Sequence, residues 1–374
     1  MANITVSTPV HRFMQSSQKR DMQSLLSVPL PLAAFTHTLT QSEWLKAAKF
    51  TSTKNTAISV TVKSTTGYAR ILNHDGTWEA VDGSGNPAHN IAVTSKSPPA
   101  DNKPSFYAII PCDASGNLDG ELTTLFLYDN QLTSFDGAGL SSVTSLNLSN
   151  NQLTSFDGTG LSSVTALFLH NNQLTSFDGT GLSSVTTLGL TNNQLTSFDG
   201  AGLSSLTSLN LSNNQFTSFD GTGLSLLTSL TLSNNQFTSF DGTGLSSLTD
   251  ISLFGNQLTS FDGTGLSLLT SLTLSYNQLT SFDGTGLSSL VFLYFSDNPL
   301  ATFENLSLPV CEAVDVQNNN LPSAELDELY TSLGVNPGTV PPWHLTGIYV
   351  AGNPGTTGDD PSIATAKGHT VYGS

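Results

Sequence analysis

The side chains that could carry acid–base or metal chemistry are few and widely separated in this sequence. No GxSxG, HExxH or phosphate-loop sequence occurs. His170 lies 21 residues from both Ser149 and Thr191, which could suggest a nucleophile pair, but chance spacing is the better explanation. The histidines show no spacing typical of paired metal ligands; they are His11, His37, His74, His89, His170, His344 and His369. The sequence therefore predicts no enzyme, no cofactor and no metal site.

One acidic position recurs with a fixed spacing. The string SFDG places an aspartate every 21 residues, at Asp136, Asp157, Asp178, Asp199, Asp220, Asp241, Asp262 and Asp283. Calcium takes six to eight oxygen ligands, and one carboxylate per repeat supplies few of them. The calcium-binding repeat GGxGxDxUx is also absent. We expect each carboxylate to accept hydrogen bonds from the Gly and Thr amides that follow it, as Asp does in turns. A calcium ladder is the weaker alternative.

The aspartates belong to a 21-residue unit, of which one copy reads VTSLNLSNNQLTSFDGTGLSS. Leu146 and Leu148 are two residues apart, so both side chains point to the same side of a short strand. Asn151 must turn inward to bond backbone groups that are freed where the strand ends. Phe156 and Leu161 should close the core from the outer side. One unit cannot bury its apolar face alone, so neighbouring units must stack on it.

The pattern Leu-x-x-Leu-x-Leu-x-x-Asn-x-Leu in each unit resembles that of the leucine-rich-repeat family, over about two thirds of the chain. This resemblance implies a β-rich, right-handed solenoid. The segment Asp157–Gly160 is too short and too glycine-rich for a helix, so we expect a convex side of turns and extended chain.

We expect four regions along the chain. Residues 1–54 form an N-terminal anchoring segment with short helices, and 55–118 form a β-rich cap with strands at 58–63, 68–72 and 106–110. Residues 119–321 form the solenoid. Residues 322–374 form a C-terminal cap with one short helix, in which Leu326, Leu329 and Leu333 share a face and Gly334 is the stop. A final repeat follows, with strand residues 348–350 and Asn353.

Charge divides the chain in two. Residues 1–103 hold ten Lys and Arg against six carboxylates, a net charge of +4, whereas residues 104–374 hold one cation against 22 carboxylates, a net charge of −21. A solenoid without cations cannot neutralise phosphates, which excludes nucleic acid as its partner. The start of the chain lacks a secretory signal, and its longest apolar patch is too short to insert into a membrane. Cys112 and Cys311 are about nine repeats apart, too far for a disulfide, and should be core thiols.

Aromatic side chains occupy exposed strand positions only near the two ends of the solenoid. Between them the same positions hold Ser, Asn and Thr, which favours a spacer. Rings on a rigid concave sheet offer contact area at low entropic cost, so we predict that they bind a protein or a glycan. The alternative is that they are packing edges beside the caps. One group is Phe126, Tyr128, Phe168 and His170, and the other is Phe254, Tyr276, Phe292 and Tyr294.

Residues 10–29 resemble a short segment of phage tail-fibre and related virion proteins. Phe13, Met14, Gln15, Leu25 and Leu26 carry this likeness. It implies a non-enzymatic virion protein, either a tail-associated fibre or receptor-binding protein or a capsid decoration. Phe13, Met14, Leu25 and Leu26 would then anchor it to other virion proteins, a fibre would favour a homotrimer, and the acidic solenoid would project toward a host-surface protein or glycan. The alternative is a bacterial leucine-rich-repeat module for protein interaction or adhesion, located in the cytoplasm or at the cell surface.

Overall fold

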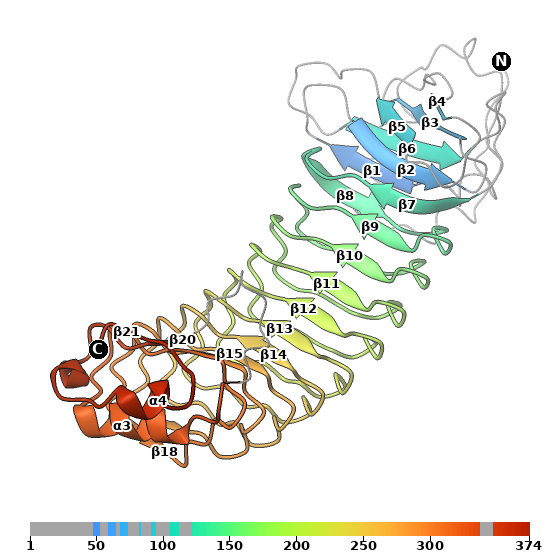
Figure 1. The fold of residues 1–374 in the computed structure, drawn as a ribbon. Helices are drawn as coiled ribbons and strands as arrows, with labels where there is room; N and C mark the ends of the chain where they lie inside the picture. Colours follow the sequence, from blue (N-terminus) through green and yellow to red (C-terminus); the bar gives the residue numbers. More distant parts are fainter. Residues whose placement is uncertain are drawn as a thin grey trace, which may run out of the picture.

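A ladder of parallel strands joins a β-rich N-terminal cap to a C-terminal cap that contains helices (Figure 1). The computed structural model describes residues 48–52, 59–64, 68–73, 82–83, 91–94, 105–111, 121–336 and 347–374. The predicted solenoid is confirmed. Its strands, all parallel, are β7 (Leu122–Phe126), β9 (Ser145–Asn147), β10 (Ala166–Phe168), β11 (Thr187–Gly189), β12 (Ser208–Asn210), β13 (Ser229–Thr231), β14 (Asp250–Ser252), β15 (Ser271–Thr273), β17 (Phe292–Tyr294), β19 (Ala313–Asp315), β20 (Gly347–Tyr349) and β21 (Val371–Tyr372).

The leucines of successive repeats stack in register and form one continuous core. Leu146 of β9 pairs with Leu125 of β7 and with Leu167 of β10, and all three side chains are fully buried. Leu148 and Leu161 of the same repeat are also fully buried, as their spacing predicted. Burial of one such side chain stabilises the fold by about 1.5–3 kcal/mol.

A buried asparagine ladder joins each repeat to the one before it. The Asn214 side-chain amide donates to the carbonyls of Leu211 in its own repeat and Leu190 in the preceding one, at 3.0 Å each. Its oxygen accepts the amide of Leu195 at 3.0 Å. Asn353 makes the same bonds across the longer last interval. The predicted inward turn of this column is therefore confirmed.

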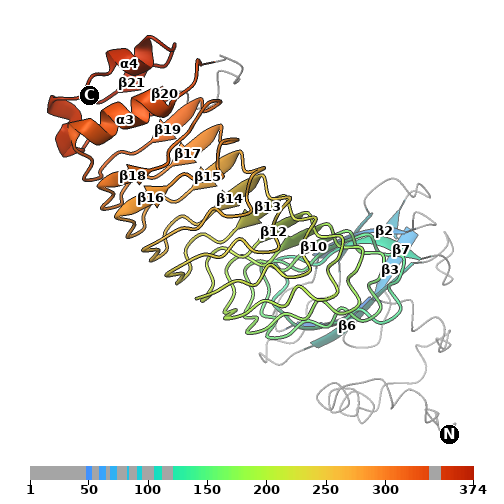
Figure 2. The ribbon, with the colours of Figure 1, turned by 90° about the horizontal axis from the view of Figure 1, so that it is seen from below.

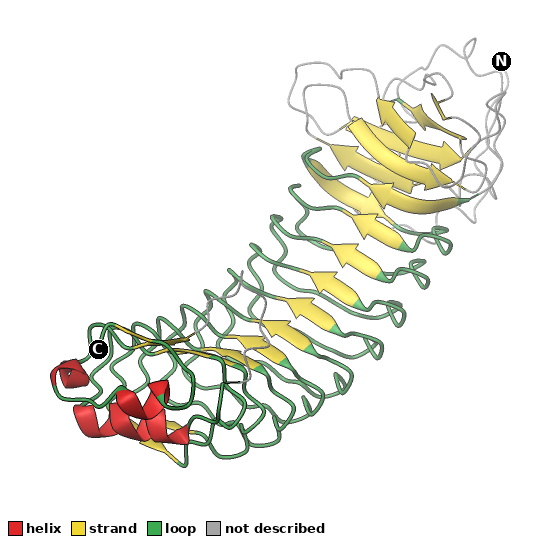
Figure 3. Ribbon diagram, viewed as in Figure 1, coloured by secondary structure: helices red, strands yellow, loops and turns green. Residues whose placement is uncertain are grey.

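The outer side of the solenoid consists of turns and extended chain, as predicted (Figure 3). The rings of Phe156, Phe177, Phe198 and Phe219 stack at 5.9–6.1 Å between centroids. The glycine of the turn is required, because Gly160 has φ +86° and a Cβ there would lie 2.6 Å from the Gly137 carbonyl oxygen. Two outer segments near the C-terminus pair as strands, β16 (Ser281–Asp283) and β18 (Thr302–Glu304).

The N-terminal cap covers the first repeat with antiparallel strands. Its strands are β1 (Ala48–Ser52), β2 (Ser59–Ser64), β3 (Tyr68–Leu72), β4 (Asp82–Gly83), β5 (Ile91–Thr94) and β6 (Ser105–Pro111). β2 pairs with β7, and β1 pairs with the first outer strand, β8 (Leu132–Asp136). The strands expected at 58–63, 68–72 and 106–110 lie within one residue of β2, β3 and β6. We expected the cap to begin at residue 55, but β1 lies before that residue. The sequence could not show this, because β1 is held by a tertiary contact, its pairing with β8.

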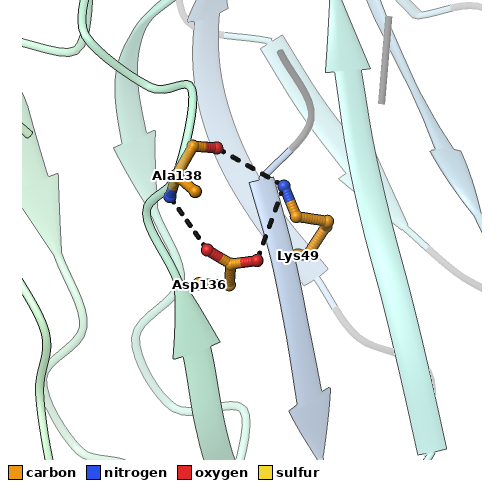
Figure 4. A network of polar contacts seen from close by, with 3 residues as sticks. All are labelled: Lys49, Asp136 and Ala138. Atoms are coloured by element: carbon orange, nitrogen blue, oxygen red, sulfur yellow. Dashed lines mark hydrogen bonds and ion pairs between the residues drawn. The ribbon is translucent and has the colours of Figure 1, made fainter. Parts of the chain in front are cut away.

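An ion pair between a buried lysine and a partly exposed aspartate joins this cap to the solenoid (Figure 4). The Lys49 ammonium lies 3.7 Å from Asp136, the first member of the aspartate column, and donates to the Ala138 carbonyl at 3.4 Å. Asp136 also accepts the Ala138 amide at 2.9 Å. Burial lowers the pKa of Lys49, and the charge of Asp136 opposes that shift.

The C-terminal cap contains the predicted helix, α3 (Ser323–Ser332), which lies beside the last strands (Figure 2). The helix buries Leu326, Leu329 and Tyr330. The predicted apolar face included Leu333, but the helix ends at Ser332, because the backbone of Leu333 is extended. Gly334 does not stop the helix by a left-handed conformation. It permits close approach instead, since a Cβ there would lie 1.9 Å from the Pro309 carbonyl oxygen.

The sequence did not predict two further elements of this cap, the 3-10 helix η3 (Pro354–Thr357) and the four-residue helix α4 (Ser362–Thr365). Lys367, just after α4, donates to the Tyr330, Thr331 and Leu333 carbonyls at 3.1, 2.7 and 2.6 Å. It thereby caps the C-terminal end of α3. Among the described residues, no helix is long and apolar enough to cross a membrane.

Candidate interaction surface on the strands

The strand face, made of the outward side chains of β7 to β20 and of the residues that follow each strand, differs between its middle and its ends. In the middle its polar side chains bond one another. The hydroxyls of Ser233 and Ser252 lie 2.8 Å apart. Asn192 donates to Asn171 at 2.6 Å. Side chains that already satisfy one another gain little from a ligand, which supports the spacer interpretation.

The N-terminal aromatic group is brought together only in part. The His170 ring meets Phe168 edge-on at 6.4 Å between centroids. Phe126 and Phe168 lie two strands apart, with Asn147 between them. Tyr128 is 44% exposed. Burial lowers the pKa of His170, and Asp129 opposes the shift. The Ser149 hydroxyl donates to Asn147, so no nucleophile pair with His170 forms.

The second aromatic group separates into two parts. Phe254 and Tyr276 contact each other at 5.0 Å between ring centroids. Tyr276 lies in the turn that follows β15, at φ +59°, a left-handed conformation. The equivalent position in other repeats holds Asn, Asp or Gly, which adopt this conformation readily; Asn213 and Asn234 both have φ +55° there. A tyrosine at this position is strained, and its ring is 55% exposed.

Tyr294 begins a column that sequence reasoning recognised only at its first member. Parallel register places Asp315 beside Tyr294, Tyr349 beside Asp315, and Tyr372 beside Tyr349. The Tyr349 and Tyr372 rings stack at 4.8 Å with an interplanar angle of 12°. Phe292 lies two residues before Tyr294 and faces the same side. We call Tyr294, Asp315, Tyr349 and Tyr372 the tyrosine column. The outward position of Tyr349 in the last predicted strand was the signal that could have revealed it.

The electrostatics of the tyrosine column centre on Asp315. Its oxygen accepts the Gln317 amide at 3.0 Å. Burial raises the pKa of Asp315, although the bonds from Gln317 and Ser296 oppose the shift. Burial likewise raises the pKa of Tyr294 and of Tyr349, and the nearby charge of Asp315 adds to both shifts. Both phenols are therefore neutral at pH 7, and Asp315 is partly withdrawn from water between them.

The aspartate column is explained by local turns. The amide two residues on donates to each carboxylate, as from Thr159 to Asp157 at 2.9 Å and from Thr243 to Asp241 at 2.8 Å. This confirms the predicted Thr bonds, whereas none is found from the intervening glycine among the described contacts. The Thr hydroxyl and then its amide lower the pKa of Asp220, Asp241, Asp262 and Asp283. Within the described ranges, no group of three or more His, Cys, Asp or Glu side chains is arranged to hold a metal.

The remaining candidates can be placed only in part. The anchoring residues Phe13, Met14, Leu25 and Leu26 lie outside the described residues, as does Cys112. Cys311 is a buried free thiol, as predicted, and burial raises its pKa to about 12. At that pKa it is not a nucleophile at neutral pH.

Comparison with known proteins agrees with the fold. Residues 121–163 and 183–225 match the family model described as leucine-rich repeats in two copies. No curated protein matches the chain. The functional domain of InlJ from Listeria monocytogenes is 25% identical with a TM-score of 0.51, over 65% of this chain and 56% of that one. A leucine-rich-repeat protein of Leptospira interrogans, LIC12759, is 27% identical with a TM-score of 0.50, over 57% of this chain and 62% of that one.

The chain thus spans 56% and 62% of the lengths of these two proteins. The InlJ structure is described as including a cysteine ladder; in the present chain asparagines and phenylalanines form the stacked columns. The chain carries leucine-rich repeats, and the solenoid that they build is the fold of leucine-rich-repeat proteins.

Proposed function

We propose that the chain is a protein-interaction module that binds its partner through the C-terminal half of the strand face. The observation that carries this proposal is Tyr276. It holds a half-exposed ring at φ +59°, where Asn or Gly would be unstrained. Such strain costs about 1–3 kcal/mol, and residues strained in this way cluster at binding and catalytic sites. Contact with Phe254 extends the exposed ring into a larger apolar surface.

The tyrosine column extends this surface by four further strands, β17, β19, β20 and β21, toward the C-terminal end. Tyrosine suits a contact surface, because its ring is large and rigid and its hydroxyl tolerates water. Two solved bacterial leucine-rich-repeat structures at 25% and 27% identity support an interaction module of this kind.

A non-catalytic role is part of the same proposal, because the strand face brings together no nucleophile and base among its described residues. The virion interpretation receives no support from the comparisons, which favour the interaction module. Its anchoring residues lie outside the described part of the chain, and the location of the protein stays a prediction.

The test compares two double variants. Tyr276→Asn with Tyr294→Ala removes the strained ring and the start of the tyrosine column. Ser229→Ala with Thr231→Ala, on β13, is the control in the polar middle of the same face. Proteins captured by the immobilised chain from a bacterial lysate are identified by mass spectrometry, and the dissociation constant of the purified partner is measured with each form.

We expect the wild-type and control chains to bind the partner equally, and the first variant to bind at least about 50-fold more weakly, the effect of removing two interface rings. Equal affinity of all three forms would show that the strand face is not the contact surface.

A further inference from the structure

We propose that the tyrosine column binds the cationic side chain of a basic segment of the partner protein, with arginine preferred. This inference rests on the proposed function, because it names the chemistry of the partner that the strand face would bind. The guanidinium would lie over Asp315, between the rings of Tyr294 and Tyr349.

The first support is geometric. Tyr294 and Tyr349 lie on either side of Asp315 in successive, registered strands. Strands two apart are separated by about 9–10 Å, and a flat group held between two rings needs about 7–8 Å between them. The Tyr294 ring can close this difference by leaning toward the inserted group. Stacking on Tyr372 fixes the plane of the Tyr349 ring.

The second support is charge. The sequence has no Lys or Arg between residues 104 and 366. Lys367, the one cation of the C-terminal region, is already bound to three carbonyls at the end of α3. Asp315 thus lies in an acidic region in which no side chain of the solenoid can neutralise it. A carboxylate that is half-buried beside two rings gains from a cation that replaces the water it has lost.

The third support is the match of Asp315 and the two rings to arginine. A guanidinium is planar, stacks on aromatic faces and donates two parallel hydrogen bonds to a carboxylate. Asp315 accepts bonds from the Gln317 amide and the Ser296 hydroxyl, and a carboxylate has about four lone-pair sites, so acceptor capacity remains for an incoming donor. Lysine would gain the charge and one ring contact, but not the planar stack. A glycan would use the rings without needing the charge.

The test uses a fluorescein-labelled peptide in which three arginines are separated by glycine pairs. A second peptide replaces each arginine by citrulline, which has the same shape without the charge. Binding to the full chain is measured by fluorescence anisotropy at 0.15 M salt, where weak long-range attraction is screened. Asp250→Asn is the matched charge control, because Asp250 is exposed on β14 of the same strand face. Tyr128→Ala is the ring control from the other end of the solenoid.

We expect Asp315→Asn and Tyr349→Ala each to weaken binding of the arginine peptide at least about five-fold, equivalent to about 1 kcal/mol. Asp250→Asn and Tyr128→Ala should change it less than about two-fold, and the citrulline peptide should bind at least about ten-fold more weakly. Equal losses with Asp250→Asn and Asp315→Asn would mean that the acidic chain attracts any cation. Equal binding of the citrulline peptide would point to a neutral ligand. Either result overturns the proposal.

Self-association provides a third outcome, because residues 1–103 are basic. If sedimentation shows oligomers of the wild-type chain that the Asp315→Asn variant does not form, the tyrosine column binds a second copy of the chain. That result excludes a segment of a partner protein. The proposed function fails separately. It fails if the captured partner binds the strand-face variants as tightly as the wild-type chain, regardless of the result with the arginine peptide. If the partner is lost by those variants while the arginine peptide does not bind, only the present inference fails.

Discussion

Replacing Asn214 by alanine tests whether the buried asparagine ladder holds the repeats together. The side chain is 8% exposed and makes bonds to two repeats. Its removal leaves the Leu195 amide without its acceptor, which costs about 1–3 kcal/mol for a buried donor. The Leu190 and Leu211 carbonyls each keep one asparagine, Asn193 and Asn235, and lose about 0.5–1 kcal/mol apiece. We expect a total loss of about 2–5 kcal/mol in the free energy of unfolding.

The assay is urea unfolding followed by circular dichroism, with Gln215→Ala as the control. Gln215 is the next residue, its side chain is exposed, and its backbone bond to Leu195 survives the change. The control should stay within about 0.5 kcal/mol of the wild type. Asn214→Asp adds a second discrimination. At pH 7 a carboxylate would face the Leu190 and Leu211 carbonyls without a donor, so the loss should be at least as large as with alanine and should shrink on acidification. An Asn214→Ala chain as stable as the Gln215→Ala chain would refute the ladder as a source of stability.

Three further predictions concern the ends and the outer side of the solenoid. Asp136→Ala removes the carboxylate that faces the buried Lys49 ammonium and should lower the free energy of unfolding by about 3 kcal/mol. Lys49→Met removes the buried charge itself and should change the free energy of unfolding by less than about 1 kcal/mol. Equal effects of the two variants in urea unfolding would contradict the ion-pair account. Lys367→Met removes three bonds at the end of α3 and should cost about 2–4 kcal/mol. Limited proteolysis should then cut within 323–374 first, and an unchanged pattern would exclude this role. The pKa of Asp220, Asp241, Asp262 and Asp283 lies below the usual 3.8 because Thr side chains and amides bond the charged form. Their contribution to stability is therefore present above about pH 4 and is lost as pH falls through the lowered values. The urea midpoint should stay constant down to about pH 4 and fall below it; a midpoint that rises below pH 4 would show that repulsion along the column dominates.

The repeats could be predicted from the sequence because one spacing determines both burial and hydrogen bonding. Leu146, Leu148 and Asn151 are fixed relative to one another within a single strand and turn, so their roles are local. The position of Asn353 could also be predicted, because its pattern recurs after the longer interval.

The tyrosine column could be predicted only in part. Tyr349 lies four residues before Asn353, as Asp315 lies four before Asn319, so their pairing follows from the asparagine spacing even though α3 separates β19 from β20. Tyr372 then joins it through β21, a strand of two residues with no pattern of its own. Tyr276 was predicted as a strand-face ring, and the structure adds that its backbone is left-handed. Aligning it with Asn213 and Asn234 would have shown this. The burial of Lys49 could not be predicted, because its partner Asp136 lies 87 residues away in the sequence.

Hydrogen exchange of the full chain, with and without its captured partner, tests the central claim most directly. If the partner binds through the C-terminal half of the strand face, the amides from β15 to β20 should exchange more slowly in the complex, with the largest change around Tyr276, Tyr294 and Asp315. The outer turns that carry the aspartate column should exchange as in the free chain. Protection confined to those outer turns, or to the N-terminal cap, would contradict the account.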